Sequence, residues 1–199
     1  MRQVSFVDNN DVTLLESGTA YFPALIAALD AAKYEVLFET YIFAEDEVGQ
    51  AVRDALIRAD RRGVKVRVLV DWIGTEHRPA ARLGAAFAAA GVQYRVFNPW
   101  CKRGIARSHR KIVVVDREIA FVGGININDD WRCDHADKHR LPAPRWDFAV
   151  QVRGPLVAQI HDEAQGQWLR AGRLKFRQRI ELFKEMRREP PESCAYPAR

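Results

Sequence analysis

The residues of this chain that could carry chemistry are gathered around His109 and Lys111. These residues stand two positions apart at the start of an apolar run, Ile112 to Val115, which predicts a buried strand. Side chains at positions i and i+2 of a strand point to the same face, so we expect the imidazole and the ammonium group to lie side by side. A nucleophile or base beside a fixed cation is suited to attack on a phosphate. Arg110 adds positive potential, which favours an anionic phosphodiester as substrate.

A tight turn and a second strand follow this run. Asp116 opens the turn, residues 119–122 predict the second strand, and that strand ends in Gly-Gly-Ile-Asn at positions 123–126. Glycines allow the backbone to approach a ligand closely, and the amide of Asn126 can donate a hydrogen bond. We therefore expect Gly124 and Asn126 to bind the substrate.

The stretch 109–126, hereafter the signature, resembles the HKD motif of the phospholipase D superfamily, HxKxxxxD followed by GGxN. Its flanks look like the first half of a bacterial cardiolipin synthase that lacks transmembrane helices; these flanks are Glu39–Phe43, Val68–Asp71, Phe121–Asn126 and Val152–Pro155. The resemblance covers about residues 4–169. Members of this family normally carry a second HKD motif in a second half, whereas the 199 residues in hand contain one copy.

The resemblance implies a role for each part of the signature. His109 would be the nucleophile that forms a phosphohistidine, and Lys111 and Asn126 would neutralise and position the non-bridging oxygens of the phosphate. Asp116 completes the catalytic motif. The resemblance implies a reaction that needs two imidazoles and a lysine, so we expect no metal and no other cofactor.

Further carboxylates are expected near the signature. In the superfamily a carboxylate that follows the motif hydrogen-bonds the catalytic histidine, and we choose Asp147 for this role, with Asp130 and Asp137 as alternatives. Glu39 and Tyr41 share one face of a predicted strand, which the resemblance places near the site. We therefore expect them to contact and orient the catalytic residues without reacting themselves. For Glu39, a structural hydrogen bond to a neighbouring loop is an equally open reading.

The polar segment from 129 to 145 invites a metal-binding interpretation. It contains Cys133, His135 and His139, with Asp134 and Asp137 among them. The spacing of these residues matches no standard zinc pattern. We therefore expect a loop that faces the substrate rather than a metal site.

Helical and strand patterns alternate along most of the chain. Helices are predicted over 17–32, 45–62, 79–90 and 155–169, and strands over 4–7, 35–43, 64–70, 92–97 and 146–152. Such alternation predicts an α/β/α sandwich with a mixed, largely parallel sheet. The hairpin at Asp116 adds antiparallel pairing. We expect residues 1–170 to form one phospholipase D-like catalytic domain.

The net charge of +5 belongs to the C-terminal residues. Residues 1–169 hold 22 basic and 22 acidic residues, whereas residues 170–199 hold 9 basic and 4 acidic ones. Residues 171–199 are predicted to form a basic helical tail, with Phe176, Ile180 and Phe183 on one stripe. Such a helix could lie on a membrane surface or pack against the body or a partner.

The sequence also predicts the compartment. No apolar run approaches the length needed to cross a bilayer, and no basic-then-apolar leader opens the chain. The three cysteines follow no framework spacing, which suits a reducing compartment. We expect a cytoplasmic protein that is peripheral at the membrane.

These observations favour a phosphatidyltransferase that acts on an anionic phospholipid at a membrane surface, as a homodimer or with a second HKD half. One alternative is a single-motif phosphodiesterase or nuclease that works as a homodimer. The neutral body argues mildly against it, because a nuclease should carry a basic groove. The other alternative is an inactive lipid-binding half that needs a second HKD half.

Overall fold

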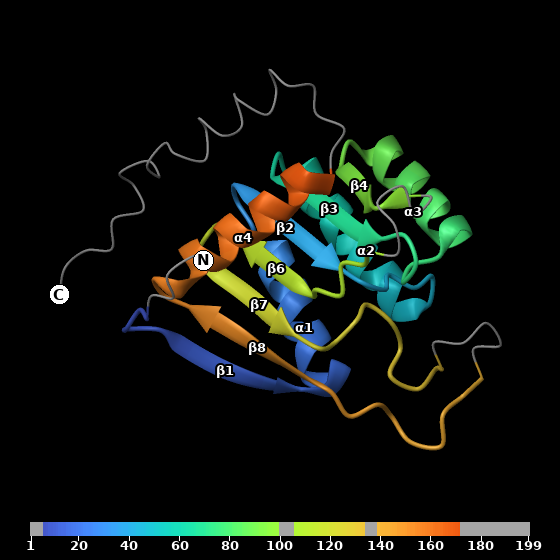
Figure 1. The fold of residues 1–199 in the computed structure, drawn as a ribbon, viewed down its shortest axis with the longest axis horizontal. Helices are drawn as coiled ribbons and strands as arrows, with labels where there is room; N and C mark the ends of the chain where they lie inside the picture. The colour runs from blue at the N-terminus through green and yellow to red at the C-terminus, as the bar shows by residue number, and fades with distance from the viewer. Residues whose placement is uncertain (1–5, 100–105, 134–138, 172–199) are drawn as a thin grey trace.

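The structure, a computed structural model, describes residues 6–99, 106–133 and 139–171 (Figure 1). These residues build a seven-stranded sheet in the order β1-β8-β7-β6-β2-β3-β4, with helices on both faces. Several predictions concern residues outside these ranges: the tail helix, and Asp134, His135 and Asp137 of the polar segment. Within the described ranges, none of the helices combines the length and the apolar composition that spanning a bilayer requires.

The elements alternate along the chain as the sequence predicts. They are β1 (Asp11–Glu16), α1 (Ser17–Ala31), β2 (Glu35–Thr40), α2 (Glu47–Arg61), β3 (Lys65–Asp71), α3 (His77–Ala90), β4 (Gln93–Phe97), β6 (Ile112–Val115), β7 (Ile119–Gly123), β8 (Phe148–Arg153) and α4 (Leu156–Ala171). The predicted α/β/α sandwich with a mixed sheet is confirmed. Among these strands, however, β2 pairs parallel with β3 and β3 pairs parallel with β4, whereas the other neighbours pair antiparallel. The mixed sheet is therefore less parallel than the sequence predicts.

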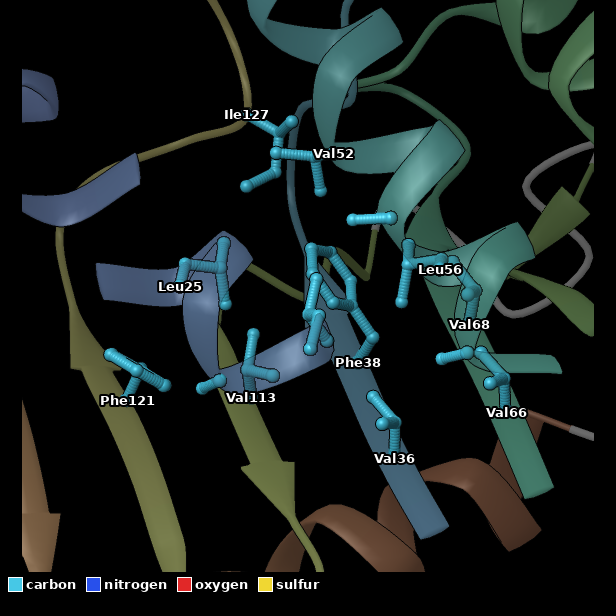
Figure 2. Close-up of a cluster of buried hydrophobic side chains, with 14 of the residues drawn as sticks. Leu25, Val36, Phe38, Val52, Leu56, Val66, Val68, Val113, Phe121 and Ile127 are labelled. Atoms are coloured by element: carbon cyan, nitrogen blue, oxygen red, sulfur yellow. The ribbon is translucent and has the colours of Figure 1, made fainter. Parts of the chain in front are cut away.

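Helices α1, α2 and α3 cover one face of the sheet and enclose the larger part of the core. Phe38 of β2 lies at its centre, between Leu25 of α1, Leu56 of α2 and Val113 of β6 (Figure 2). These four side chains are almost completely buried. Alternate residues of β2 and β6 face this core. The opposite face of the sheet is also covered, which explains why β6 is apolar at every position.

Helix α4 covers the opposite face and crosses the sheet obliquely (Figure 1). Its Val157 and Ala164 pack on Leu37, Val114 and Val152 of the sheet. Polar side chains also fix this helix. They pair across the interface as His161 with Glu35, Gln165 with Arg67, and Gln167 with Ser108. The α4 face of the sheet is therefore a mixed apolar and polar interface.

The first strand lies later in the chain than the sequence predicts. Residues 6 and 7, the described part of the strand expected at 4–7, are not in a strand, and β1 begins at Asp11. Strand β1 is an edge strand that pairs antiparallel with β8, and most of its side chains are exposed. An exposed edge strand has little hydrophobic patterning, so its sequence gives a weak signal.

Replacing a leucine with alanine should lower the free energy of unfolding more at a buried position than at an exposed one. Leu25 is fully buried in α1, whereas Leu14 in β1 is largely exposed. Leu25→Ala removes methyl groups from a packed core and should lower the free energy of unfolding by about 2–5 kcal/mol. Leu14→Ala should change it by no more than about 0.5 kcal/mol. Urea unfolding followed by circular dichroism measures both, and equal effects would contradict the described packing of α1.

Candidate active site

The antiparallel pairing of β6 with β2 places the start of the signature. Glu39 lies opposite Ile112 in this register, so the residues before β6 meet the residues after β2. His109 accordingly lies against Tyr41, with their ring centroids 4.5 Å apart. Two segments that are distant in the sequence thus meet at one end of the sheet.

His109 and Lys111 lie side by side at this end. The Lys111 Nζ atom is 3.2 Å from both the Nδ1 and the Nε2 atom of His109, and 5.1 Å from the centre of the Tyr41 ring. The imidazole is exposed, whereas the lysine is buried. Its ammonium group can therefore donate to a neutral imidazole and stay within reach of an anion that approaches it.

The glycine-rich end of β7 lies next to this pair. The Gly123 N–H donates to the carbonyl of Lys111 at 3.3 Å, and the Gly124 N–H donates to the carbonyl of Phe148 at 2.9 Å. The Asn126 Oδ1 atom accepts from the Ile42 N–H at 3.2 Å, so its amide nitrogen remains as a donor. The turn is thus tied to the end of β2 as well as to Lys111.

Asp147 lies beside the glycine turn, but it does not hold the His109 ring. Its carboxylate occupies the space where a side chain at Gly124 would be, and its Oδ1 atom accepts the Phe148 N–H at 2.7 Å. Within the described ranges, His109 contacts Tyr41 and Lys111, and no carboxylate hydrogen-bonds its ring. Asp147 explains why glycine is needed at position 124, and its proposed contact with His109 is absent from this conformation.

The alternative acceptor Asp130 is also engaged elsewhere. Its Oδ2 atom accepts the Gly18 N–H at the start of α1 at 2.7 Å. Burial raises the pKa of its carboxyl group, and the bond from Gly18 partly offsets this effect.

Of the metal-ligating residues that the polar segment offers, the structure describes Cys133 and His139. No group of three metal-ligating side chains forms in the described part of the chain.

Asp116 lies at the far end of β6 from His109. Its carboxylate accepts the consecutive N–H groups of Lys33, Tyr34 and Glu35, each at 2.8 Å. In return, the Asp116 N–H donates to the carbonyl of Glu35. An extended chain over this distance spans roughly 20 Å, so Asp116 cannot touch a group that reacts at His109. Its contacts are those of a residue that ties the β6–β7 turn to the start of β2.

Glu39 and Arg110 meet on the α4 face of the sheet. The Arg110 Nε atom is 3.5 Å from Glu39 Oε2, and the Ser108 hydroxyl donates to Glu39 Oε1. Burial raises the pKa of Glu39, while the Ser108 hydroxyl, Arg110 and Arg170 act in the opposite direction. Arg110 is therefore paired with a buried carboxylate on the α4 face of the sheet. This position differs from the expected one, in which Arg110 would bind substrate next to His109.

A polar cavity of about 470 Å³ adjoins the signature. It opens between the segment after β2, the segment before α3 and the segment after Asn126, and both carboxylates and arginines line it, among them Glu45, Glu47, Glu76, Arg132 and Arg140. Ile42, which also lines it, is the residue whose N–H binds Asn126. The cavity is thus next to the site, and it is polar enough for a hydrophilic headgroup.

Comparison with known proteins agrees with this geometry. Residues 25–135 match the family described as "Cardiolipin synthase, PLD-like domain". Cardiolipin synthase B of Salmonella typhimurium is 39% identical over 159 residues, which are 77% of this chain and 37% of that protein. Among solved structures, the phospholipase D family member Nuc from Salmonella typhimurium superposes with a TM-score of 0.63 at 20% identity, covering 83% of this chain and 97% of that one. Phosphatidylserine synthase from Haemophilus influenzae superposes with a TM-score of 0.58 at 17% identity, covering 76% and 34%.

The fold is therefore that of the phospholipase D superfamily. The chain belongs to the family of cardiolipin synthase PLD-like domains, because more than half of it matches that family. It spans little more than a third of the length of the cardiolipin synthases it matches. The resemblance that the signature indicates is confirmed.

The position of Asp116 leads to a prediction about stability. Asp116→Ala removes the acceptor of three backbone N–H groups and should lower the free energy of unfolding by about 2–4 kcal/mol. Asp116→Asn, which tolerates the left-handed backbone at this position, should lower it less. Urea unfolding of both variants measures this, with Glu118→Ala, an exposed residue of the same turn, as the control. If Asp116→Ala unfolds like the control, the carboxylate does not stabilise the turn.

Proposed function

We propose that this chain is one catalytic half of a phosphatidyltransferase of the phospholipase D type, similar in activity to a cardiolipin synthase. The observation that carries the proposal is the pair at the end of β6: an exposed His109 whose two ring nitrogens are each 3.2 Å from the buried ammonium group of Lys111. Membership of the cardiolipin synthase PLD-like family supports a phospholipid as the substrate class.

In the first half of the proposed reaction, a neutral His109 attacks the phosphorus of a phospholipid. A bond between nitrogen and phosphorus forms as the bond from phosphorus to the leaving alcohol breaks. Lys111, which lies beside His109, and the amide nitrogen of Asn126 would stabilise the negative charge on the non-bridging oxygens.

The leaving alcohol needs a proton, which a second imidazole must supply. In the second half of the reaction, that imidazole accepts the proton of the incoming alcohol, whose oxygen attacks phosphorus as the bond to His109 breaks. The 199 residues contain one HKD motif. We propose that a second copy of the chain provides the second imidazole, because a two-fold axis brings identical residues face to face. Another HKD half would serve equally.

Because the substrate is a lipid, the protein would act as a peripheral protein at the cytoplasmic surface of a membrane. The neutral body offers no general attraction for anionic lipid, so the basic residues after position 169 would supply the electrostatic part of that attraction. The anionic phospholipid and the membrane surface are thus the proposed partners, together with the second HKD half.

A phosphodiesterase acting on nucleic acid is the second candidate. The chain covers 97% of the length of Nuc, so the two are of similar size. The equal numbers of basic and acidic residues before position 170 argue against it, because nucleic-acid binding draws on an excess of positive charge. A cleavage assay on DNA beside a lipid-product assay separates the two candidates. Inactivity in both would favour a non-catalytic lipid-binding half.

The shared site leads to a prediction from mixing. His109→Ala should abolish turnover and leave the fold intact, because the side chain is exposed. When wild type and His109→Ala exchange subunits freely, each mixed dimer lacks either the nucleophile or the acid. Activity should then fall as the square of the wild-type fraction, measured by the release of lipid product.

The control is His77→Ala, a histidine outside the signature whose ring packs against Trp72 at a tilt. Mixing it with wild type should leave activity proportional to total protein. A linear decrease for His109→Ala, with subunit exchange proven, would mean that each chain works alone. A folded His109→Ala protein that retains substantial turnover would exclude this residue as the nucleophile.

The proposed reaction also predicts resistance to chelators. Two imidazoles and a lysine supply all the groups that the chemistry requires. Turnover should therefore be unchanged after dialysis against EDTA. Loss of activity on chelation and recovery with zinc would instead indicate a metal site that includes Cys133 and His139.

A further inference from the structure

Ser108, the residue directly before His109, is held by three different elements. Its N–H donates to Asp71 Oδ2 at the end of β3, at 2.7 Å. Its hydroxyl group donates to Glu39 Oε1 of β2 and accepts from Gln167 Nε2 of α4 at 3.3 Å. All four residues are buried. Ser108 is therefore anchored although it belongs to a segment without regular secondary structure.

The groups that hold Ser108 are themselves fixed. The second oxygen of Asp71 accepts the N–H groups of Ile73 and Gly74, at 2.8 Å and 3.1 Å. Gln167 Oε1 accepts from Arg170 Nε at 3.0 Å. Glu39 is fixed by its ion pair with Arg110. The hydrogen bonds of Ser108 thus fix its backbone relative to β2, β3 and α4.

His109 itself has few contacts of its own. Among the described residues its ring contacts Tyr41 and Lys111, and the side chain is exposed, so its direction depends on the backbone that carries it. A displacement of about 1 Å of a reacting group can lower a rate by about a hundredfold. A nucleophile on the open end of a sheet therefore needs its adjoining backbone to be rigid.

We infer that Ser108 is a positioning residue, which orients His109 through its hydroxyl bridge between Glu39 of β2 and Gln167 of α4. Ser108 does not touch the reacting atoms. Its hydroxyl instead couples the docking of α4, on the far face of the sheet, to the direction of the imidazole. The inference rests on the proposed function only where turnover is measured.

The electrostatics of Glu39 support this arrangement. Burial raises the pKa of this carboxyl, and the hydroxyl of Ser108 is the first of the groups that counteract the effect. Within the described ranges its Oε2 atom has no hydrogen-bond partner, so Oε1 carries the bond that the hydroxyl provides. Removal of the hydroxyl leaves a buried carboxylate without that bond, and its surroundings must rearrange. The rearrangement would reach His109, one residue away.

The experiment compares three variants of the full chain. Ser108→Ala removes the bridge and keeps the N–H bond to Asp71. Gln167→Ala removes the hydrogen bond from α4 to the Ser108 hydroxyl, together with the bond that Gln167 accepts from Arg170. Gln165→Ala is the matched control: it is also a glutamine of α4, is about equally buried, and accepts a hydrogen bond from Arg67 of β3 instead of contacting Ser108.

The readout is the NMR spectrum of histidine-labelled protein. The Tyr41 ring should shift the ring protons of His109 upfield, and His109→Ala assigns those signals among the five histidines. Ser108→Ala should remove most of this upfield shift, Gln167→Ala should reduce it, and Gln165→Ala should leave it unchanged. Where turnover is measured, Ser108→Ala should lower kcat about tenfold or more with KM unchanged.

The NMR result does not require turnover, so it tests the inference even if the proposed function fails. Unchanged His109 signals in folded Ser108→Ala and Gln167→Ala would overturn it. An equal change in Gln165→Ala would also overturn it, because the effect would then come from general loosening of α4. If Ser108→Ala does not fold, Gln167→Ala against Gln165→Ala decides.

Discussion

The antiparallel pairing of β6 with β2 is the constraint on which the site depends. Both strands are covered on both faces, by α1 and α2 on one side and by α4 on the other. A slip of one residue would exchange Val113 with Val114 between the two cores and would turn His109 and Lys111 to the opposite face of the sheet. The observed register is the one that brings His109 to Tyr41.

Polar contacts then fix the two ends of β6 where burial cannot. At the turn, Asp116 binds three N–H groups at the start of β2, and at the other end Ser108 binds carboxylates from β2 and β3. A short strand held in this way has little freedom to slide or twist. The carboxylates near the signature thus act chiefly on the backbone, and the proposed chemistry draws on His109, Lys111 and Asn126.

The sequence predicted what is local and left open what depends on distant contacts. The signature stood out because strand, turn and strand follow one another within 18 residues, and alternation along β6 placed His109 beside Lys111. Asp116 and Asp147 were assigned to catalysis by residue type and motif position, which do not reveal what a carboxylate binds. Nothing near Ser108 in the sequence indicates Asp71 or Gln167, because these contacts depend on how β3 and α4 pack.

The exposure of the proposed nucleophile gives a physical reason for the proposed shared site. His109 is exposed, whereas Lys111 beside it is buried. Phosphoryl transfer through a phosphohistidine needs water kept away until the acceptor arrives, since water would otherwise hydrolyse the intermediate. In the described part of the chain no segment covers the imidazole. A second HKD half placed over the same end of the sheet would exclude water and supply the acid in one step. The two requirements of the chemistry, a proton and a dry site, therefore call for the same partner surface.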